Sequence, residues 1–112
     1  MNTDQTRANI LELCSESEYG SWEFWSTKDN KTKEEMELIL QTLIDLVQEK
    51  KIRVLERESS GKYKEVSLNV ERLKTELKQS MIPYNVNLDT FYWFEATDIG
   101  KKEDHTLRSA QQ

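Results

Sequence analysis

The residue types that most often perform catalysis are scarce in this chain. It has one histidine, His105, one cysteine, Cys14, and three glycines. A metal site or a general base would need partners at a suitable spacing around His105, and none is present. No glycine-rich phosphate loop occurs, and Cys14 on an apolar helix face is typical of a small core residue. The sequence predicts a protein that is not an enzyme and that uses no cofactor, metal or small molecule.

A basic segment is the first candidate for contact with a partner. Residues 50–64 contain six bases and two acids, a net charge of +4. Basic side chains on a hairpin can contact phosphates without reading bases, which makes four of them candidate nucleic-acid contacts: Arg53, Arg57, Lys62 and Lys64. The same charges also prevent an exposed edge strand from pairing with other chains, and we favour this second interpretation.

The segment before it is acidic. From Glu34 to Glu49 there are five acids and no base, so this helix would be repelled by phosphates. Its outward side contains the apolar Leu38 and Ile44, which suggests contact with another protein or a second copy. The candidate protein interface consists of Leu38, Gln41, Ile44 and Asp45. The alternative is that another part of the chain covers Leu38 and Ile44.

Nine of the ten aromatic residues fall within residues 19–25 and 84–94. Exposed rings can stack on the bases of single-stranded nucleic acid, but that function requires interleaved basic residues, and residues 82–100 contain none. We therefore expect the two clusters to pack together in the core. On a strand, Tyr92 and Phe94 share one face and Phe91 and Trp93 the other. One of these pairs stays exposed. Because Tyr and Trp dominate binding hot spots, Tyr92 of one pair and Trp93 of the other are the candidate interface anchors.

Length and charge set the limits on the elements that position these residues. The chain has 112 residues, of which 36% are apolar, and a net charge of −5. This suffices for one domain with one core and gives no general attraction to nucleic acid or anionic membranes. The absence of a secretory signal, the absence of an apolar run of about 18 residues and the single cysteine together predict a cytoplasmic protein.

Periodicity and turn residues predict the elements. Apolar spacing predicts a first helix over residues 4–16, and Gly20-Ser21 can start a short second one. Thr32 and Glu35 have the spacing of a capping box at the start of a main helix that ends near Lys50. The remaining predicted elements are a β-hairpin over residues 52–68 with Gly61 at its tip, a helix over 70–80 capped by Asn69, strand-like segments at 84–88 and 91–94, and a polar, disordered tail.

Residues 36–68 resemble the winged-helix branch of helix-turn-helix proteins, and the resemblance rests on the segment "LQTLIDLVQEKKIRVLERESSGKYKEVSL". In that family the hairpin that follows the helix is the wing. "YWFEATDIGKK", residues 92–102, is similar to the strand and Thr-x-x-Gly-Lys that many such regulators have near a wing, although here a further helix comes first. The resemblance implies an α+β fold with a single winged-helix-like domain over residues 1–100: three N-terminal helices, a hairpin wing, a further helix and a C-terminal aromatic strand. Residues 101–112 are the predicted tail.

The resemblance also implies a surface that faces DNA, which the acidic main helix disfavours. The first hypothesis is therefore a binding module that acts through protein contacts, as a regulatory adaptor or a small acidic inhibitor, with dimerisation left open. The alternative is a DNA-binding transcriptional regulator that grips phosphates through its basic wing.

Overall fold

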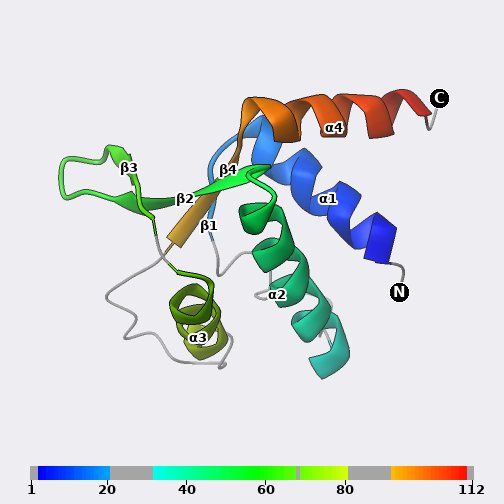
Figure 1. Ribbon diagram of the computed structural model, residues 1–112. Coiled ribbons are helices and arrows are strands. Elements are labelled where there is room, and N and C mark those ends of the chain that lie inside the picture. Colours follow the sequence, from blue (N-terminus) through cyan, green and yellow to red (C-terminus); the bar gives the residue numbers. More distant parts are fainter. Residues whose placement is uncertain (1–2, 21–31, 68, 81–91, 111–112) are drawn as a thin grey trace.

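The computed structural model describes residues 3–20, 32–67, 69–80 and 92–110. Within them the chain forms helices and strands of an α+β protein (Figure 1). In chain order the elements are α1 (Thr3–Glu16), β1 (Tyr19–Gly20), α2 (Lys33–Gln48), β2 (Ile52–Arg57), β3 (Tyr63–Glu65), α3 (Val70–Ser80), β4 (Tyr92–Ala96) and α4 (Asp98–Ala110). The strands form one antiparallel sheet in the order β1-β4-β2-β3, so the last strand lies between two earlier ones.

Side-chain caps fix the starts of two helices where the sequence predicts them. The Thr32 hydroxyl accepts a hydrogen bond of 3.1 Å from the Glu35 amide at the start of α2. The Asn69 side chain accepts one of 2.7 Å from the Arg72 amide at the start of α3. Each cap satisfies an amide that has no partner within its helix, so both predicted boundaries are confirmed.

Lys50 ends α2 in an uncommon backbone conformation. Its φ is +61°, in the left-handed region that a non-glycine residue seldom adopts. The Lys50 amide donates to the Val47 carbonyl at 3.0 Å, and the Lys51 amide donates to the Leu46 carbonyl at 2.9 Å. These bonds satisfy two carbonyls of the last turn and direct the chain into β2.

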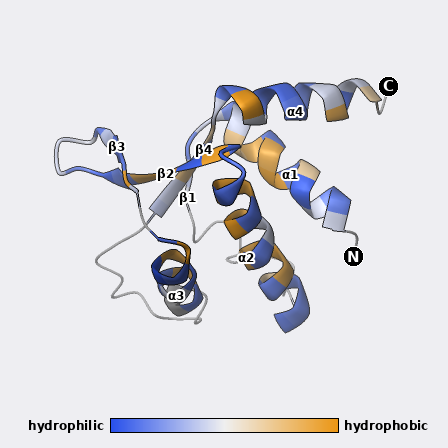
Figure 2. Ribbon diagram, in the orientation of Figure 1, coloured by the Kyte–Doolittle hydropathy of each residue, from blue (hydrophilic) through white to orange (hydrophobic). Residues whose placement is uncertain are grey.

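The core lies between the helices and one face of the sheet. Alternate residues of β2 and β4 point into it, and helices α1, α2 and α3 supply the rest. The buried apolar side chains of this cluster are Ile10, Leu11, Cys14, Ile39, Leu40, Leu43, Ile44, Leu46, Ile52, Val54, Leu73, Leu77, Tyr92, Phe94 and Ala96. Figure 2 shows hydrophobic residues along α1 and α2, whereas α4 is mainly hydrophilic.

The β2–β3 hairpin projects from the body of the molecule (Figure 1). Its loop is closed by the Glu58 amide, which donates to the Lys62 carbonyl at 2.7 Å. Gly61 has a φ of +88°, which glycine adopts without strain. The predicted hairpin with glycine at its tip is confirmed.

Two predictions about the fold are wrong. Residues 101–110 are not a disordered tail but belong to α4, which packs against α1. Tyr19–Gly20 is a strand rather than the opening of a helix. Polar contacts to distant parts of the chain hold α4 in place, and pairing with β4 holds β1. Both elements depend on these distant contacts, which a local apolar pattern cannot predict. The rest of the predicted second helix and the strand at 84–88 lie outside the described residues.

Candidate binding surfaces

The outward face of α2 is acidic and polar. Glu34, Glu37, Gln41 and Gln48 are exposed, and Leu38 and Asp45 are half-buried. Each of these residues lies three or four positions from another of them, so they form one stripe along the helix. The Gln41 side-chain amide donates to the Asp45 carboxylate at 2.9 Å, which links two members of the stripe. We call these six residues the α2 stripe.

Ile44 does not belong to this surface, and its prediction as an interface residue is wrong. Only 2% of Ile44 is exposed, and it is part of the core. The reason is that α2 packs against both α1 and α3, so its buried side is wider than a single row of leucines. Leu38, Gln41 and Asp45 keep at least partial exposure.

The four predicted wing contacts do not form one continuous surface. Arg57, Lys62 and Lys64 are exposed. Arg53 instead forms an ion pair with Glu95 on the neighbouring strand, with 3.5 Å between Arg53 Nε and Glu95 Oε1. Lys64 lies directly opposite Glu56, on the other face of the hairpin from Arg57.

The aromatic strand divides as its alternation predicts, but Tyr92 is not an exposed anchor. Tyr92 is 3% exposed, packs in the core and donates a hydrogen bond through its hydroxyl to Glu76 of α3. Burial and this carboxylate raise the pKa of Tyr92. Trp93 points to the opposite face of the sheet, is half-buried and meets Tyr63 of β3 edge-on, with ring centroids 5.2 Å apart. Phe91 lies outside the described residues.

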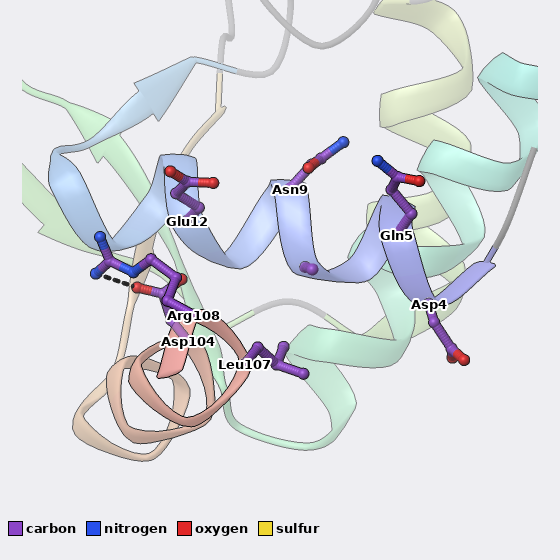
Figure 3. A pocket seen from close by; sticks show the side chains of 8 residues that line it. Asp4, Gln5, Asn9, Glu12, Asp104, Leu107 and Arg108 are labelled. Carbon is purple, nitrogen blue, oxygen red and sulfur yellow. Dashed lines mark hydrogen bonds and ion pairs between the residues drawn. The ribbon is translucent and has the colours of Figure 1, made fainter. Parts of the chain in front are cut away.

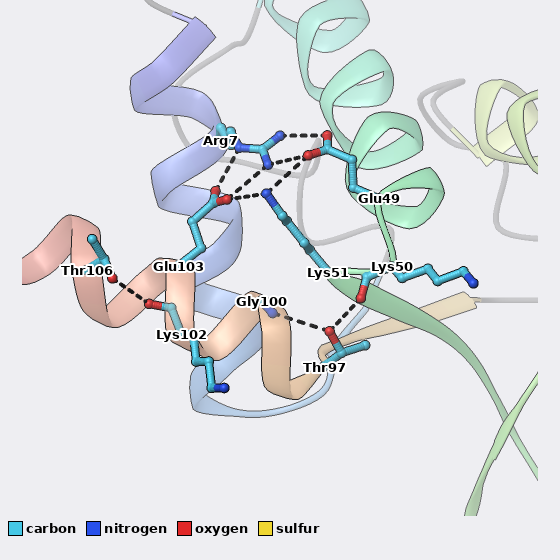
Figure 4. A network of polar contacts seen from close by, with 9 residues as sticks. All are labelled: Arg7, Glu49, Lys50, Lys51, Thr97, Gly100, Lys102, Glu103 and Thr106. Atoms are coloured by element: carbon cyan, nitrogen blue, oxygen red, sulfur yellow. Dashed lines mark hydrogen bonds and ion pairs between the residues drawn. The ribbon is translucent and has the colours of Figure 1, made fainter.

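A polar network joins elements far apart in the sequence (Figure 4). Arg7 of α1 donates to both Glu49, at 2.8 Å and 3.0 Å, and Glu103 of α4, at 2.8 Å and 3.2 Å. Lys51 also bridges them: its ammonium lies 3.2 Å from Glu49 and donates to Glu103. The network ties α1 and α4 to the segment where α2 passes into β2.

Hydrogen bonds within the network shift the ionisation of its members. Hydrogen bonds from Arg7 lower the pKa of Glu49 to about 2 and also lower the pKa of Glu103. Hydrogen bonds to Glu49 raise the pKa of Arg7, and one to Glu103 raises that of Lys51. All four groups are charged at neutral pH, and their charges are opposed in pairs, which is typical of a structural ion-pair network.

Beside this network, Thr97 and Gly100 fasten the start of α4 to the end of α2 (Figure 4). The Thr97 hydroxyl donates to the Lys50 carbonyl at 2.6 Å and accepts from the Gly100 amide at 3.3 Å. The Thr97 amide donates to the Lys51 carbonyl at 3.0 Å. Gly100 is buried against Lys51, and a Cβ there would overlap the Lys51 carbonyl oxygen. We call these contacts the Thr97–Gly100 clasp.

The clasp and the network were not predicted as sites. The Thr-x-x-Gly spacing was a signal in the sequence, but it was interpreted as a feature found near a wing rather than as the start of a packed helix. Arg7 and Glu103 are 96 positions apart, so no sequence spacing could pair them.

Open cavities lie beside these contacts. One, of about 450 Å³, lies between α1 and α4 and is lined mainly by polar side chains (Figure 3). At its floor Asp104 is 2% exposed and accepts a 2.6 Å hydrogen bond from Arg108. Another, of about 460 Å³, lies at the end of α2 beside the hairpin. Neither cavity contains Cys14 or His105.

Cys14 and His105, the two residues considered for catalysis or metal binding, differ in burial. Burial raises the pKa of Cys14 to about 12, so its thiol is protonated at neutral pH and a poor nucleophile. His105 is exposed on α4. Residues 3–20, 32–67, 69–80 and 92–110 include no cluster of three His, Cys, Asp or Glu side chains suited to a metal ion. No helix described here combines the length and the apolar character needed to cross a bilayer.

The chain matches no protein-family model, no curated protein and no solved structure.

Proposed function

We propose that this chain is a non-catalytic, winged-helix-like binding module that recognises a basic protein partner through the α2 stripe. The proposal rests on one observation: from Glu34 to Glu49 an exposed helix face has acids and amides but no base. Opposite charge attracts a basic partner and sets the rate of association. The same face repels nucleic acid and acidic proteins.

The stripe also offers more than charge. Leu38 gives an apolar contact in its middle, and Gln41 is exposed beside it. Asp45 and Gln41 already hold each other, so less side-chain freedom is lost when a partner binds. A partner with Lys or Arg on either side of an apolar residue matches this pattern. An adaptor or a small acidic inhibitor that acts in the cytoplasm on such a partner is the corresponding role.

Self-association is less compatible with the α2 stripe. A two-fold dimer places the same patch of each copy face to face. Glu34, Glu37 and Asp45 of one copy would then oppose acids of the other, with no base on the stripe to offset them. A partner of different sequence is therefore favoured over a second copy.

The test is titration with a labelled helical peptide rich in Lys, Arg and Leu, beside a peptide with Glu in place of the bases. We expect only the basic peptide to bind, and Glu37→Lys and Gln41→Lys each to weaken it several-fold, since each exposed charge pair contributes about 0.2–1 kcal/mol. Glu16→Lys, the same change at the exposed end of α1, is the matched control.

Equal weakening by Glu16→Lys would mean that only net charge matters, and the stripe would lose its role. Absence of binding at about 50 mM salt would reject a basic partner of this kind. Mass measurement in solution, made on the same samples, checks whether a second copy occupies the stripe instead.

A duplex DNA regulator is the second candidate, because the hairpin projects from the body with Arg57, Lys62 and Lys64 exposed (Figure 1). Mixed-sequence duplex at about 50 mM and then about 200 mM salt tests it. Tight binding that weakens steeply with salt and is abolished by Arg57→Glu or Lys62→Glu would replace the first proposal. Absence of duplex binding at the lower salt would retire this candidate.

A further inference from the structure

The cavity at the end of α2 is built from separate parts of the chain. Its volume is about 460 Å³, which lies in the range of cavities that hold small organic ligands. The end of α2, the start of β2 and the segment that follows β3 form its walls. The lining residues are Val47, Lys50, Ile52, Arg53, Val54, Glu65, Val66, Ser67 and Thr97. We call this cavity the β2 cleft.

Four lining residues are β-branched aliphatics. Ile52 and Val54 belong to the core and are 2% and 4% exposed. Val47 and Val66 are half-buried and pack against that core from α2 and from the end of the hairpin. The Val66 amide donates to the Val54 carbonyl at 2.9 Å, which holds this wall against β2. Val47 and Val66 therefore keep aliphatic surface that an apolar ligand can cover.

Lys50 supplies a cation to the cleft. Its side chain is exposed, and no carboxylate of the described residues forms an ion pair with its ammonium. Figure 4 shows the ammonium directed away from the neighbouring ion-pair network. The main chain of Lys50 is fixed on both sides, because its amide donates to Val47 at 3.0 Å and its carbonyl accepts from the Thr97 hydroxyl at 2.6 Å. The ammonium is thus an available charge on a fixed backbone.

The backbone conformation makes a lysine at this position informative. Lys50 has a φ of +61° and follows the last turn of α2, where glycine is the usual residue. Glycine adopts this conformation without strain, whereas a residue with a side chain does not. Strained backbone conformations are concentrated at functional sites. A lysine that combines this strain with a place in a cavity wall points to a role for its ammonium besides ending the helix.

The other charged residues of the cleft do not neutralise Lys50. Arg53 already has its ion pair with the neighbouring strand. Glu65 lies opposite Leu55 in the ladder, three residues along β2 from Ile52. Each strand residue adds about 3.3 Å, so Glu65 is displaced by about 10 Å along β2 from the Ile52 end. The cleft therefore has a cationic end at Lys50 and an acidic end at Glu65, with the aliphatic surface between them.

We infer that the β2 cleft binds a short aliphatic carboxylate, with the carboxylate on the Lys50 ammonium and the hydrocarbon chain against Val47 and Val66. A cation at one end of an aliphatic wall complements an anion at one end of an aliphatic chain. The distance of about 10 Å to Glu65 limits the chain to about six to eight carbons. The inference goes beyond the proposed function and uses no residue of the α2 stripe. The sequence predicted no small-molecule site, because the cleft walls meet only in the fold.

Other anions use less of the cleft. An inorganic anion would pair with Lys50 but would leave the aliphatic surface of Val47 and Val66 uncovered. The C-terminus of a peptide that ends in leucine has the same two groups, but its remaining amides also need hydrogen-bond partners. A free aliphatic acid has no such requirement and uses the cation and the aliphatic walls together.

The experiment follows the amide NMR spectrum of the isotope-labelled full chain during titration with hexanoate. We expect saturable shifts at Val47, Lys50 and Val66, with a dissociation constant of about 1 mM, as is usual for so small a ligand. Acetate has the charge without the chain, and hexanamide has the chain without the charge. Each should bind at least about fivefold more weakly than hexanoate.

Lys50→Gly separates binding from stability, because it removes the ammonium and the backbone strain together. Hexanoate affinity should fall about fivefold, while the urea midpoint of the free chain should rise by about 0.5 M. Lys50→Arg keeps the charge and should hold affinity within about twofold. Lys101→Gln, which removes an exposed charge from α4, is the control for net charge and should leave affinity unchanged.

Val66→Thr tests the aliphatic wall. Threonine has nearly the shape of valine but places a hydroxyl in the cleft. Hexanoate affinity should fall about threefold, whereas acetate affinity should not change, because acetate has no chain to contact the wall.

Four outcomes would overturn the inference. They are equal affinity for hexanoate and hexanamide, equal losses in Lys50→Gly and Lys101→Gln, no saturable shifts up to about 50 mM hexanoate, and a Lys50→Gly chain with a lowered urea midpoint. Tighter binding of a peptide that ends in leucine would replace the free acid with a peptide terminus. Glu37→Lys, which should weaken binding of the basic peptide, should not change hexanoate affinity, so the two proposals can fail separately.

Discussion

Replacing Gly100 with alanine should destabilise this fold by about 2–3 kcal/mol, although alanine is the better helix former. Gly100 lies in the first turn of α4 and is buried against Lys51. A Cβ there would overlap the Lys51 carbonyl oxygen and lie 2.9 Å from the carbonyl carbon. Real Cβ atoms essentially never approach other atoms within 3.0 Å, so α4 must move away from the end of α2.

The magnitude follows from three contributions. Overpacking of this kind costs about 1–3 kcal/mol. Displacing α4 also weakens the Thr97 bonds to Lys50 and Lys51, each worth about 0.5–1.5 kcal/mol. Alanine returns about 1 kcal/mol through helix propensity. With the middle of each range and the Thr97 bonds at least half lost, the net loss is about 2–3 kcal/mol, which is a large part of the stability of a domain of this size.

Urea denaturation followed by circular dichroism measures this loss. With an m value of about 1–2 kcal/mol/M, the midpoint should fall by roughly 1–3 M. Lys102→Ala, at an exposed position of the same helix, should change stability by no more than about 0.5 kcal/mol. A Gly100→Ala chain as stable as the parent, or more stable, would refute the close approach of α4 to Lys51.

A double-mutant cycle separates the clash from its consequences. Thr97→Val removes the hydroxyl that donates to Lys50 and should cost about 1–2 kcal/mol in the parent chain. In the Gly100→Ala chain that bond is already weakened, so the same change should cost less. Fully additive losses would mean that the two residues act independently and that the Thr97–Gly100 clasp is not one unit.

Three further predictions concern ionisation and burial. Folding lowers the pKa values of Glu49 and Glu103, so their contribution to stability is complete above about pH 5 and is lost as pH falls towards 2. The urea midpoint measured against pH should fall over this range, and Glu103→Gln should make that fall smaller. Cys14 should not react with a thiol reagent in the folded chain at neutral pH but should react in urea, and rapid reaction of the folded chain would contradict its burial. Ile44→Ala should cost about 2–5 kcal/mol and Gln41→Ala less than about 0.5, and equal costs would place Ile44 outside the core.

Local sequence was sufficient to predict a structural feature where the contacts that define the feature lie within one short segment. The caps at Thr32 and Asn69 bind amides three residues ahead, so the starts of α2 and α3 can be predicted from spacing alone. Gly61 marks the hairpin tip because glycine alone adopts its φ without strain. Alternation along β4 gave the correct division between the side of Phe94 and the side of Trp93.

Local sequence could not predict which side of β4 faces the core. Tyr92 and Trp93 are adjacent, aromatic and similar in polarity, and only the position of β4 between β1 and β2, with the helices on one side, buries Tyr92. Ile44 is buried because α2 has helices on two sides. These outcomes depend on contacts between residues far apart in the chain, which periodicity does not contain.

By itself, the sequence determined the α+β class, the acidic charge of α2 and the basic charge of the hairpin, because composition and spacing belong to each segment. Only the tertiary structure decided that residues 101–110 form a packed helix, since Arg7, Lys51 and the end of α2 hold α4 from 40 or more positions away. It alone also brought Trp93 beside Tyr63 and Arg57, because sheet pairing places distant strands side by side. The candidate surfaces of this protein are therefore products of strand order as much as of residue type.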